Sequence, residues 1–295
     1  MKNIYKELSQ LKERYERGEN IIQYLKDNHK DLSRIESILL SYDLQAGSYI
    51  EAFNKNPDRK IAYCKELASK LEKIGPFTSI LNVGVGEATI LANFISNLKE
   101  QPKKVFGFDI SWSRVNKAVD FMKRFEINNF TLTTGDLFYS PFMDNSIELV
   151  FSNHSLEPNG GREVEALKEL YRISSKYIVI NEPCYEWASA EGKKRIEKHG
   201  YVKDLHIVAK RLGYEIVSHE KFENPIALLN PTSCLIIKKP EAYRKETKTL
   251  ACPITRTPLE TKNNVLFSPT SLLSYPVING IPCLNSNNAI LTTAM

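Results

Sequence analysis

Glycine and acidic residues stand at the ends of two apolar runs in this 295-residue chain, where they could bind a nucleoside. The first run leads into Gly84 and Gly86, at a point where a strand would turn into a helix, and Asp109 ends the next run. Glycines allow a ligand to approach the backbone at such a turn. A carboxylate at the second strand end can accept hydrogen bonds from both hydroxyls of a ribose. A tight turn and a helix N-cap are the alternative uses of these residues.

The glycine pattern differs from the dinucleotide-binding fingerprint at its third position. Thr89 stands three residues after Gly86, where that fingerprint has a glycine. Because the full fingerprint serves a pyrophosphate, a pyrophosphate site is less favoured, and a ligand that contains no phosphate remains compatible with the sequence. An NAD-dependent dehydrogenase is therefore the least favoured of the enzymes considered.

Two further apolar runs also end in polar residues. Gly135 and Asp136 follow the third run, and Ser152, Asn153 and His154 follow the fourth. The Asp136 carboxylate can meet an adenine amino group, or it can form an Asx turn. Polar groups at the carboxyl ends of central strands lie in the crevice where parallel sheets bind ligands. We therefore expect all four strand ends to face one site.

The region from Phe77 to Lys239 must supply the sheet that brings these ends together. Strands are predicted at Ser79–Val83, Lys104–Asp109, Phe130–Thr133, Ile147–Ser152, Tyr177–Asn181, Glu215–Lys221 and Ser233–Lys238. Helices are predicted between them at Ala88–Asn97, Ser113–Phe125, Glu163–Ile173 and Ala188–Leu212. This alternation indicates a doubly wound parallel sheet. About eleven residues separate the last two strands, too few for a helical crossover, so the final strand should run antiparallel.

Two smaller regions flank this sheet. Residues 1–75 show the apolar spacing of amphipathic helices, for example at Leu8, Leu11 and Tyr15, and are expected to form a helical cap. Residues 76–240 would form the ligand-binding domain. Residues 241–295 carry Pro and Gly punctuation without a helical period, which predicts a small β-rich module.

Composition narrows the class of protein further. No apolar run approaches the ~18 residues that a membrane span requires, so no membrane-spanning segment is predicted. The charged start of the chain lacks the apolar stretch of a secretory signal, and the five scattered cysteines suggest reduced thiols. These features predict a cytoplasmic protein. The formal charge of +5 is mild and gives little support to a nucleic-acid partner.

Taken in this order, the motifs resemble the class I S-adenosylmethionine-dependent methyltransferase family. The matching segments are LNVGVGEAT, VFGFDIS, TGDLFYSPFMDNSIELVFSNHSLE and the terminal hairpin, within about residues 40–239. The resemblance implies a Rossmann-like, doubly wound α/β sheet of seven strands with an antiparallel last strand, and S-adenosyl-L-methionine as the cofactor. The residues that it assigns to cofactor binding are Tyr42, Gln45, Tyr49, Asn82, Gly84, Gly86, Asp109, Ile110, Gly135, Asp136, Leu137, Ser152 and Asn153.

The same resemblance assigns parts of the cofactor to individual residues. Gly84 and Gly86 would pass beneath the methionine moiety, and Asp109 would hold the ribose. Asp136 and Leu137 would flank the adenine. The polar segment after the fourth strand would lie near the sulfonium.

One residue weakens this assignment, and one segment has an alternative role. Asn82 departs from the family, in which many members have Asp or Glu, and this weakens the expected contact with the amino group of the cofactor. The segment YDLQAGSY, which contains Tyr42, Gln45 and Tyr49, looks like a segment that closes over the cofactor in many relatives. Ordinary packing is the alternative role for these three side chains.

Methyl transfer from a sulfonium depends on alignment and on exclusion of water. A hydroxyl or protonated amine must also lose a proton, for which a base with a pKa near neutrality is suited. His154 is the first candidate for this base and Glu157 the second, with a structural histidine at the rim of the pocket as the alternative. The candidates for the acceptor pocket are Glu182, Tyr185, His199 and Tyr201.

The tail resembles the small ribbon-like module of activator subunits of RNA and protein methyltransferases. The matching pieces are CPITRTPL and YPVINGIP. Metal-binding relatives have C-P-x-C and a second cysteine pair, whereas here Thr255 replaces the second cysteine and Cys283 stands alone. Four tetrahedral ligands cannot be assembled from these residues, so no metal is predicted. The module is expected to cover one flank of the catalytic domain or to mediate a homodimer.

These observations favour methyl transfer to an oxygen or nitrogen of a small-molecule acceptor, such as a sugar derivative or a natural product. The ribbon-like tail suggests an RNA or protein methyltransferase as the main alternative. A non-catalytic module that retains a cofactor pocket for stability is a second alternative, from a different class.

Overall fold

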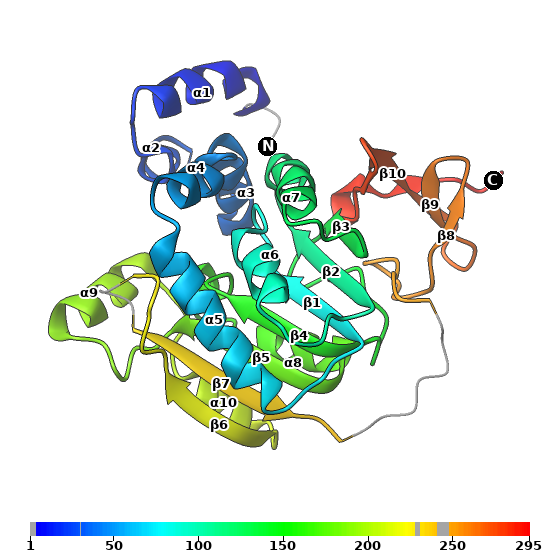
Figure 1. Cartoon of the computed structure of the whole chain (residues 1–295). Helices are drawn as coiled ribbons and strands as arrows, with labels where there is room; N and C mark the ends of the chain where they lie inside the picture. The colour runs from blue at the N-terminus through cyan, green and yellow to red at the C-terminus, as the bar shows by residue number, and fades with distance from the viewer. Residues whose placement is uncertain (1–3, 30, 228–230, 241–247) are drawn as a thin grey trace.

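A computed structural model describes residues 4–29, 31–227, 231–240 and 248–295. Most of the charged segment between the sheet and the C-terminal module lies outside these residues. The chain folds into a central sheet with helices on both faces, a helical cap near the N-terminus and a small β-rich module at the C-terminus (Figure 1).

The central sheet has seven strands in the order β3-β2-β1-β4-β5-β7-β6. Their bounds are β1 Ser79–Val83, β2 Lys104–Asp109, β3 Phe130–Thr134, β4 Ile147–Asn153, β5 Ser174–Pro183, β6 Glu215–Lys221 and β7 Thr232–Lys238. Strands β1 to β5 pair in parallel, and β7 pairs antiparallel with both β5 and β6. The predicted sheet and its reversed last strand are confirmed.

Helices cover the two faces of this sheet because neighbouring strand residues point to opposite sides. The first face carries α5 Asp58–Glu72, α6 Thr89–Ser96 and α7 Trp112–Arg124, and the second carries α8 Glu163–Ile173 and α10 Leu205–Arg211. In β1, Ile80 belongs to the core on the first face and Leu81 to the core on the second. In the central strand β4, Leu149 belongs to the first core and Val150 to the second. The sheet is thus buried on both faces, as the continuous apolar runs of its strands predict.

The segment predicted as one helix at Ala188–Leu212 forms two helices. Helix α9 spans Ala190–His199, and α10 begins at Leu205. Gly200 ends α9 in the left-handed conformation, and Asp204 precedes α10 with a φ of 55°. The single-helix prediction was therefore wrong, because the glycine supplies a helix C-cap inside a stretch of helical spacing.

The described part of the N-terminal cap contains the short 3-10 helix Ile4–Lys6 and the α-helices α1 to α4. Their bounds are α1 Leu8–Glu16, α2 Ile21–Asn28, α3 Arg34–Leu44 and α4 Ser48–Lys55. Helix α3 begins with a capping box, in which the Ser33 side chain accepts from the Glu36 N–H and the Glu36 carboxylate accepts from the Ser33 N–H. Helix α4 was not predicted from the sequence. Together, α3, α4 and the start of α5 lie over the carboxyl ends of the strands (Figure 1).

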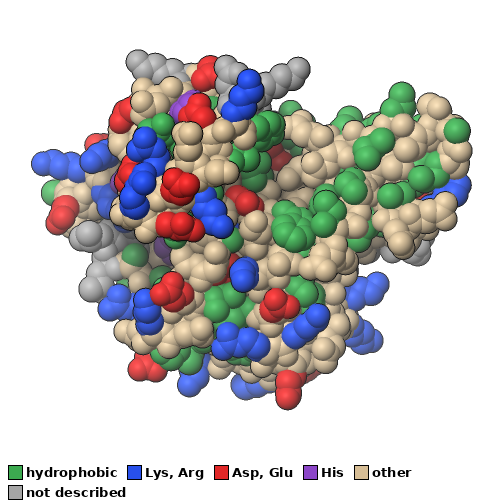
Figure 2. Space-filling view, turned by 90° about the horizontal axis from the view of Figure 1, so that it is seen from above, with side chains coloured by type: hydrophobic (Ala, Val, Ile, Leu, Met, Phe, Trp, Pro, Cys, Tyr) green, Lys and Arg blue, Asp and Glu red, His purple; other side chains and the backbone are tan. Residues whose placement is uncertain are grey.

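The C-terminal module is a small antiparallel sheet with its own core. Its strands are β8 Glu260–Lys262, β9 Val265–Ser268, β10 Leu273–Ile278, β11 Ile281–Pro282 and β12 Ile290–Leu291. Cys252, Leu266 and Tyr275 are buried in that core. The module lies beside the edge strand β3 (Figure 1), where Cys283 pairs in parallel with Thr134. Figure 2 shows it as a projecting lobe with hydrophobic side chains on the visible face.

Candidate functional site

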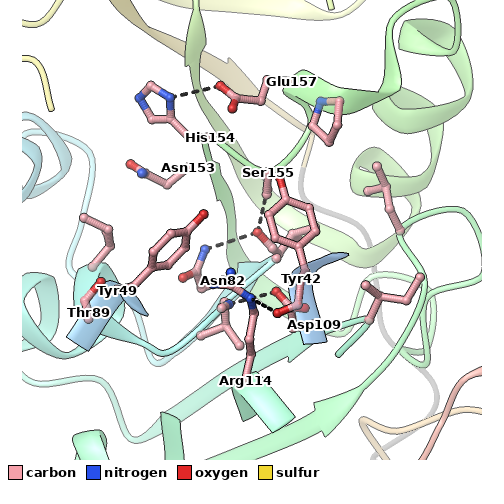
Figure 3. A pocket seen from close by; sticks show the side chains of 18 of the residues that line it. Tyr42, Tyr49, Asn82, Thr89, Asp109, Arg114, Asn153, His154, Ser155 and Glu157 are labelled. Atoms are coloured by element: carbon pink, nitrogen blue, oxygen red, sulfur yellow. Dashed lines mark hydrogen bonds and ion pairs between the residues drawn. The ribbon is translucent and has the colours of Figure 1, made fainter. Parts of the chain in front are cut away.

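A cavity of about 660 Å³ opens at the carboxyl ends of β1, β2, β3 and β4, beneath α3 and α4 (Figure 3). Most of the residues predicted for the cofactor and for catalysis line it. They are Tyr42, Tyr49, Asn82, Gly84, Gly86, Asp109, Ile110, Gly135, Asp136, Leu137, Asn153, His154 and Glu157. The four strand ends therefore face one cavity.

The turn after β1 forms the floor of the cavity with the backbone of Gly84 and Gly86, which carry no side chains. Gly84 has a φ of +66°, and a Cβ built on it would lie 2.2 Å from the Cβ of Ser155. Gly86 has a φ of +54°, and its Cβ would meet the Tyr49 ring at 3.7 Å. Only a glycine combines this backbone conformation with the close approach at position 84.

Asp109 joins the ends of β1 and β2. Its Oδ2 accepts the Gly86 N–H at 2.9 Å, and its Oδ1 accepts the Ser111 N–H at 3.0 Å. Burial raises the pKa of the carboxyl, against the lowering effect of these N–H groups and of the Arg114 charge. The carboxyl lies in the cavity wall at the place where the sequence predicts a ribose contact.

Asp136 forms the Asx turn that the sequence left open as one of its two roles. Its Oδ1 accepts the Phe138 N–H at 2.8 Å, and burial raises the pKa of the carboxyl. The residue nevertheless lines the cavity together with Gly135 and Leu137. The turn therefore orients a side chain that faces the ligand space.

A buried ion pair at the cavity wall was missed by the sequence analysis. Arg114 and Glu87 are 1% and 0% exposed at their side chains, and Arg114 Nη1 lies 3.4 Å from Glu87 Oε1. The Arg114 Nε–H donates to the Tyr42 carbonyl at 2.8 Å, and the guanidinium lies 4.2 Å from the centre of the Tyr49 ring. Arg114 Nη2 is buried without a hydrogen-bond partner among the described residues. Arg114 is charged within the apolar face of α7, a signal that could have identified it.

The carboxylate of Glu87 fastens the helical cap to the sheet. It accepts the N–H groups of Gly47 at 3.0 Å, Tyr49 at 3.3 Å and Ile50 at 2.8 Å, all at the start of α4. These bonds complement the positive end of a helix. In the opposite direction, Asp43 of the cap accepts from the Ser111 hydroxyl at 2.6 Å. The cap is thus hydrogen-bonded to the turns after both β1 and β2.

His154 lies at the exit of β4 with both ring nitrogens engaged. Its Nδ1 lies 3.2 Å from Glu157 Oε2, and its Nε2 lies 2.9 Å from the Thr232 hydroxyl. Burial lowers the pKa of the imidazole, but the hydrogen bond and the charge of Glu157 outweigh it, so that the pKa is raised above 6.5. Asn153 beside it accepts a hydrogen bond from the Tyr63 hydroxyl.

Glu182 lies outside the cavity wall, although the sequence analysis considered it for the acceptor pocket. Its side chain is fully buried and accepts the N–H groups of Ser155 at 3.1 Å, Leu156 at 3.1 Å and Glu157 at 3.0 Å. Burial raises the pKa of Glu182 to about 7. The carboxyl therefore holds the loop after β4, which begins the 3-10 turn Glu157–Asn159.

The remaining candidates also lie outside the cavity wall. The Tyr185 hydroxyl donates to Glu197 at 2.6 Å on the outer part of the molecule, and the His199 ring stacks on Tyr201. Gln45 ends α3, and Ser152 is buried within β4. The cavity wall also contains residues that were not predicted, among them Ile35, Ile38, Arg59, Lys60, Asn159 and Arg195.

Within the described residues, no helix is long and apolar enough to cross a membrane. The same part of the chain contains no group of three His, Cys, Asp or Glu side chains that could hold a metal ion.

Residues 75–249 match the family described as a methyltransferase domain, whereas no curated protein matches the chain. Among solved structures, a chain of the complex between a methyltransferase activator and a putative methyltransferase from Haloferax volcanii has a TM-score of 0.51 and 12% identity, with 67% of this chain and 96% of that chain covered. Magnesium protoporphyrin IX methyltransferase from Synechocystis has a TM-score of 0.48 and 14% identity, over 60% and 81%. A SAM-dependent methyltransferase from Aquifex aeolicus has a TM-score of 0.47 and 16% identity, over 65% and 97%. With more than half of its length matched by the family, the chain belongs to the class I S-adenosylmethionine-dependent methyltransferases.

Proposed function

We propose that this methyltransferase acts on an oxygen or nitrogen atom of a small molecule. The observation that carries the proposal is the position of the cavity between the strand ends and the cap, with Ile35 and Ile38 of α3 and Ala52 of α4 in its wall. A concave, largely apolar site of this size suits a small ligand beside the cofactor.

The residues of the cavity fit S-adenosylmethionine. Gly84 leaves backbone space that a Cβ would fill, and Arg114 Nη2 is a buried donor without a partner among the described residues. We propose that Gly84 and Gly86 lie beneath the methionine moiety, that Asp109 accepts from the ribose hydroxyls, and that Asp136 contacts the adenine. The other cavity-lining candidates complete this site, whereas Gln45 and Ser152 support it from outside the wall.

The bound cofactor supplies an electrophilic methyl group on a sulfonium. The chain contributes alignment of the acceptor and exclusion of water, through the cap that Glu87 and Asp43 hold in place. We propose His154 as the base that removes a proton from the acceptor, with Glu157 orienting its Nδ1–H. In neutral His154, Nε2 would carry no proton. The bound acceptor would then replace the Thr232 hydroxyl as the hydrogen-bond donor to Nε2.

Replacement of Asp109 by Ala should raise the Kd for S-adenosylhomocysteine by about 30-fold, because hydrogen bonds to a charged group contribute about 1.5–3 kcal/mol. The variant also loses the tie to the Gly86 N–H. Isothermal titration calorimetry measures the effect, with Asp120→Ala on the exposed face of α7 as the control. An unchanged Kd for Asp109→Ala would remove the ribose assignment.

The imidazole of His154 should titrate above pH 6.5, and Glu157→Gln should move its midpoint downward, because the substitution removes the carboxylate that raises the pKa. Since the native pKa is raised, the contribution of this group to stability is present below pH 6.5 and is lost as the pH rises through the native pKa. A base must be neutral, so the methylation rate should rise over the same interval. NMR titration measures the midpoint, and His219, whose pKa is lowered by burial, provides an internal comparison.

The acceptor class is tested by incubating the protein and a cell extract with radiolabelled S-adenosylmethionine and separating the products by size. The proposal requires label in the small-molecule fraction and loss of that label with His154→Ala. Label in RNA that falls steeply with salt would favour the alternative of an RNA substrate, and label in protein would favour a protein substrate.

We also propose that the chain is organised as a cap at residues 1–75, a cofactor-binding domain at 76–240 and a module at 241–295. The exposed apolar side chains of the module, among them Ile278, Ile290 and Leu291, support a homodimer through this lobe. Sedimentation velocity would detect it.

A further inference from the structure

The C-terminal module holds the loop after β3 at both of its ends. At the first end, Cys283 pairs in parallel with Thr134, the last residue of β3. At the second end, Met143 donates its N–H to the Thr249 carbonyl at 2.9 Å, and Ala251 donates to the Pro141 carbonyl at 3.0 Å. The loop between these two contacts is therefore fixed by backbone hydrogen bonds to a part of the chain more than 100 residues away.

The loop held in this way forms one wall of the cavity. Gly135, Asp136, Leu137 and Phe138 line the ligand space. A Cβ on Gly135 would lie 2.8 Å from the Pro141 ring, so Pro141, which the module binds through Ala251, packs directly behind the wall. Ala251 of the module thus contacts Pro141, and Pro141 contacts Gly135 in the cavity wall.

A second link reaches the same loop through Glu169 of α8. This buried carboxylate accepts the Ser140 N–H at 3.2 Å and also accepts a hydrogen bond from Arg256 of the module at 3.3 Å. The Arg256 side chain is about half exposed, whereas that of Glu169 is 5% exposed. The positive charge of Arg256 therefore helps to hold the Glu169 carboxylate, which in turn binds the loop at Ser140.

Asn285 connects the module to the opposite wall. Its Nδ2 donates to the carbonyl of Ile110 at 3.2 Å. Ile110 follows Asp109 and lines the cavity on the β2 side. The Oδ1 of Asn285 is buried without a hydrogen-bond partner among the described residues.

We propose that Asn285 is a positioning residue for the adenosyl group, and that the C-terminal module is part of the cofactor site. This inference rests on the proposed placement of the adenosyl group between Ile110 and the segment 135–138. Asn285 fixes the first wall through Ile110, and the backbone at Cys283 fixes the second through Thr134. The Gly135 N–H donates to the Asp109 carbonyl at 2.9 Å and joins the two walls, and the module holds each wall from outside, so that the slot is already ordered when the cofactor binds.

The test is the affinity of Asn285→Ala for S-adenosylhomocysteine and for 5′-methylthioadenosine, which lacks the amino-acid end. Loss of one hydrogen bond that orders the slot should weaken both ligands by about five-fold. Asn285→Asp has the same shape, but its carboxylate oxygen would repel the Ile110 carbonyl, so it should weaken both ligands at least as much. The melting temperature without ligand should stay close to that of the wild type, because Asn285 lies at the edge of the module.

Asn116→Ala is the matched control. It removes another hydrogen bond between the module and the sheet domain, from Asn279 Nδ2 to Asn116 Oδ1 at 2.9 Å, at a partly exposed position of α7. This variant should bind both ligands as the wild type does. Wild-type affinity in Asn285→Ala, or an equal loss in Asn116→Ala, would overturn the role of Asn285. Failure of the wild-type protein to bind S-adenosylhomocysteine would instead overturn the proposed cofactor site on which the inference rests.

Discussion

Glu87→Gln should lower the free energy of unfolding by about 4 kcal/mol, because breaking a buried ion pair leaves an uncompensated charge. Arg114 would remain 1% exposed at its side chain and would lose the ion pair with Glu87, which leaves only the electrostatic interaction with Asp109. The neutral amide would also be a weaker acceptor for the three N–H groups of the cap that Glu87 now binds. The loss should therefore include detachment of the cap from the turn after β1.

Urea denaturation with a double-mutant cycle tests this prediction. Replacing both charged partners by neutral groups is often far less costly than removing one, so Glu87→Gln combined with Arg114→Met should recover part of the loss. Glu51→Gln is the control, since its pair with Lys55 is exposed and should contribute less than about 0.5 kcal/mol. A loss below 1 kcal/mol for Glu87→Gln would contradict the importance of the pair.

The strands could be predicted because each is a short apolar run bounded by polar or turn residues. Strand β1 at Ser79–Val83 and β2 at Lys104–Asp109 have the predicted bounds, and the short connection before β7 correctly required an antiparallel strand. The same runs end in the residues that line the cavity, so the position of the site followed from the strand ends. Chain order and local spacing were sufficient for these features.

Features that depend on tertiary contacts could not be predicted. An acidic residue such as Glu87 is ordinarily expected at the surface, and its sequence neighbours do not indicate burial. Only the folded chain brings it to Arg114 and to the start of α4. Glu182 lies near the end of β5, at a position typical of an acceptor contact, yet its carboxyl accepts hydrogen bonds from the loop after β4. The break between α9 and α10 is different, because it arises from the local helix C-cap at Gly200, which the continuous helical spacing of the segment concealed.

Gly84→Ala should lower the free energy of unfolding by about 3 kcal/mol and abolish measurable binding of S-adenosylhomocysteine. The left-handed conformation alone is not prohibitive, since Ala88 adopts a φ of 58° nearby. The decisive factor is space, because the new Cβ would lie 2.2 Å from the Cβ of Ser155. Relief of that overlap would displace Ser155 from its hydrogen bond to the Val83 carbonyl at 2.8 Å and shift the loop after β4. Overpacking of this kind costs about 1–3 kcal/mol in addition to the backbone strain.

Gly86→Ala separates these two causes. Its backbone is similarly left-handed at +54°, but its Cβ would meet only the Tyr49 ring, at the ordinary contact distance of 3.7 Å. The substitution should therefore cost about 1 kcal/mol, the strain alone. Thermal denaturation and calorimetry on both variants provide the comparison. Equal losses would mean that conformation, and not the approach of Ser155, requires the glycine. A larger loss at position 84 would identify the contact between the β1 turn and the β4 exit as the constraint that keeps the floor of the cavity free of side chains.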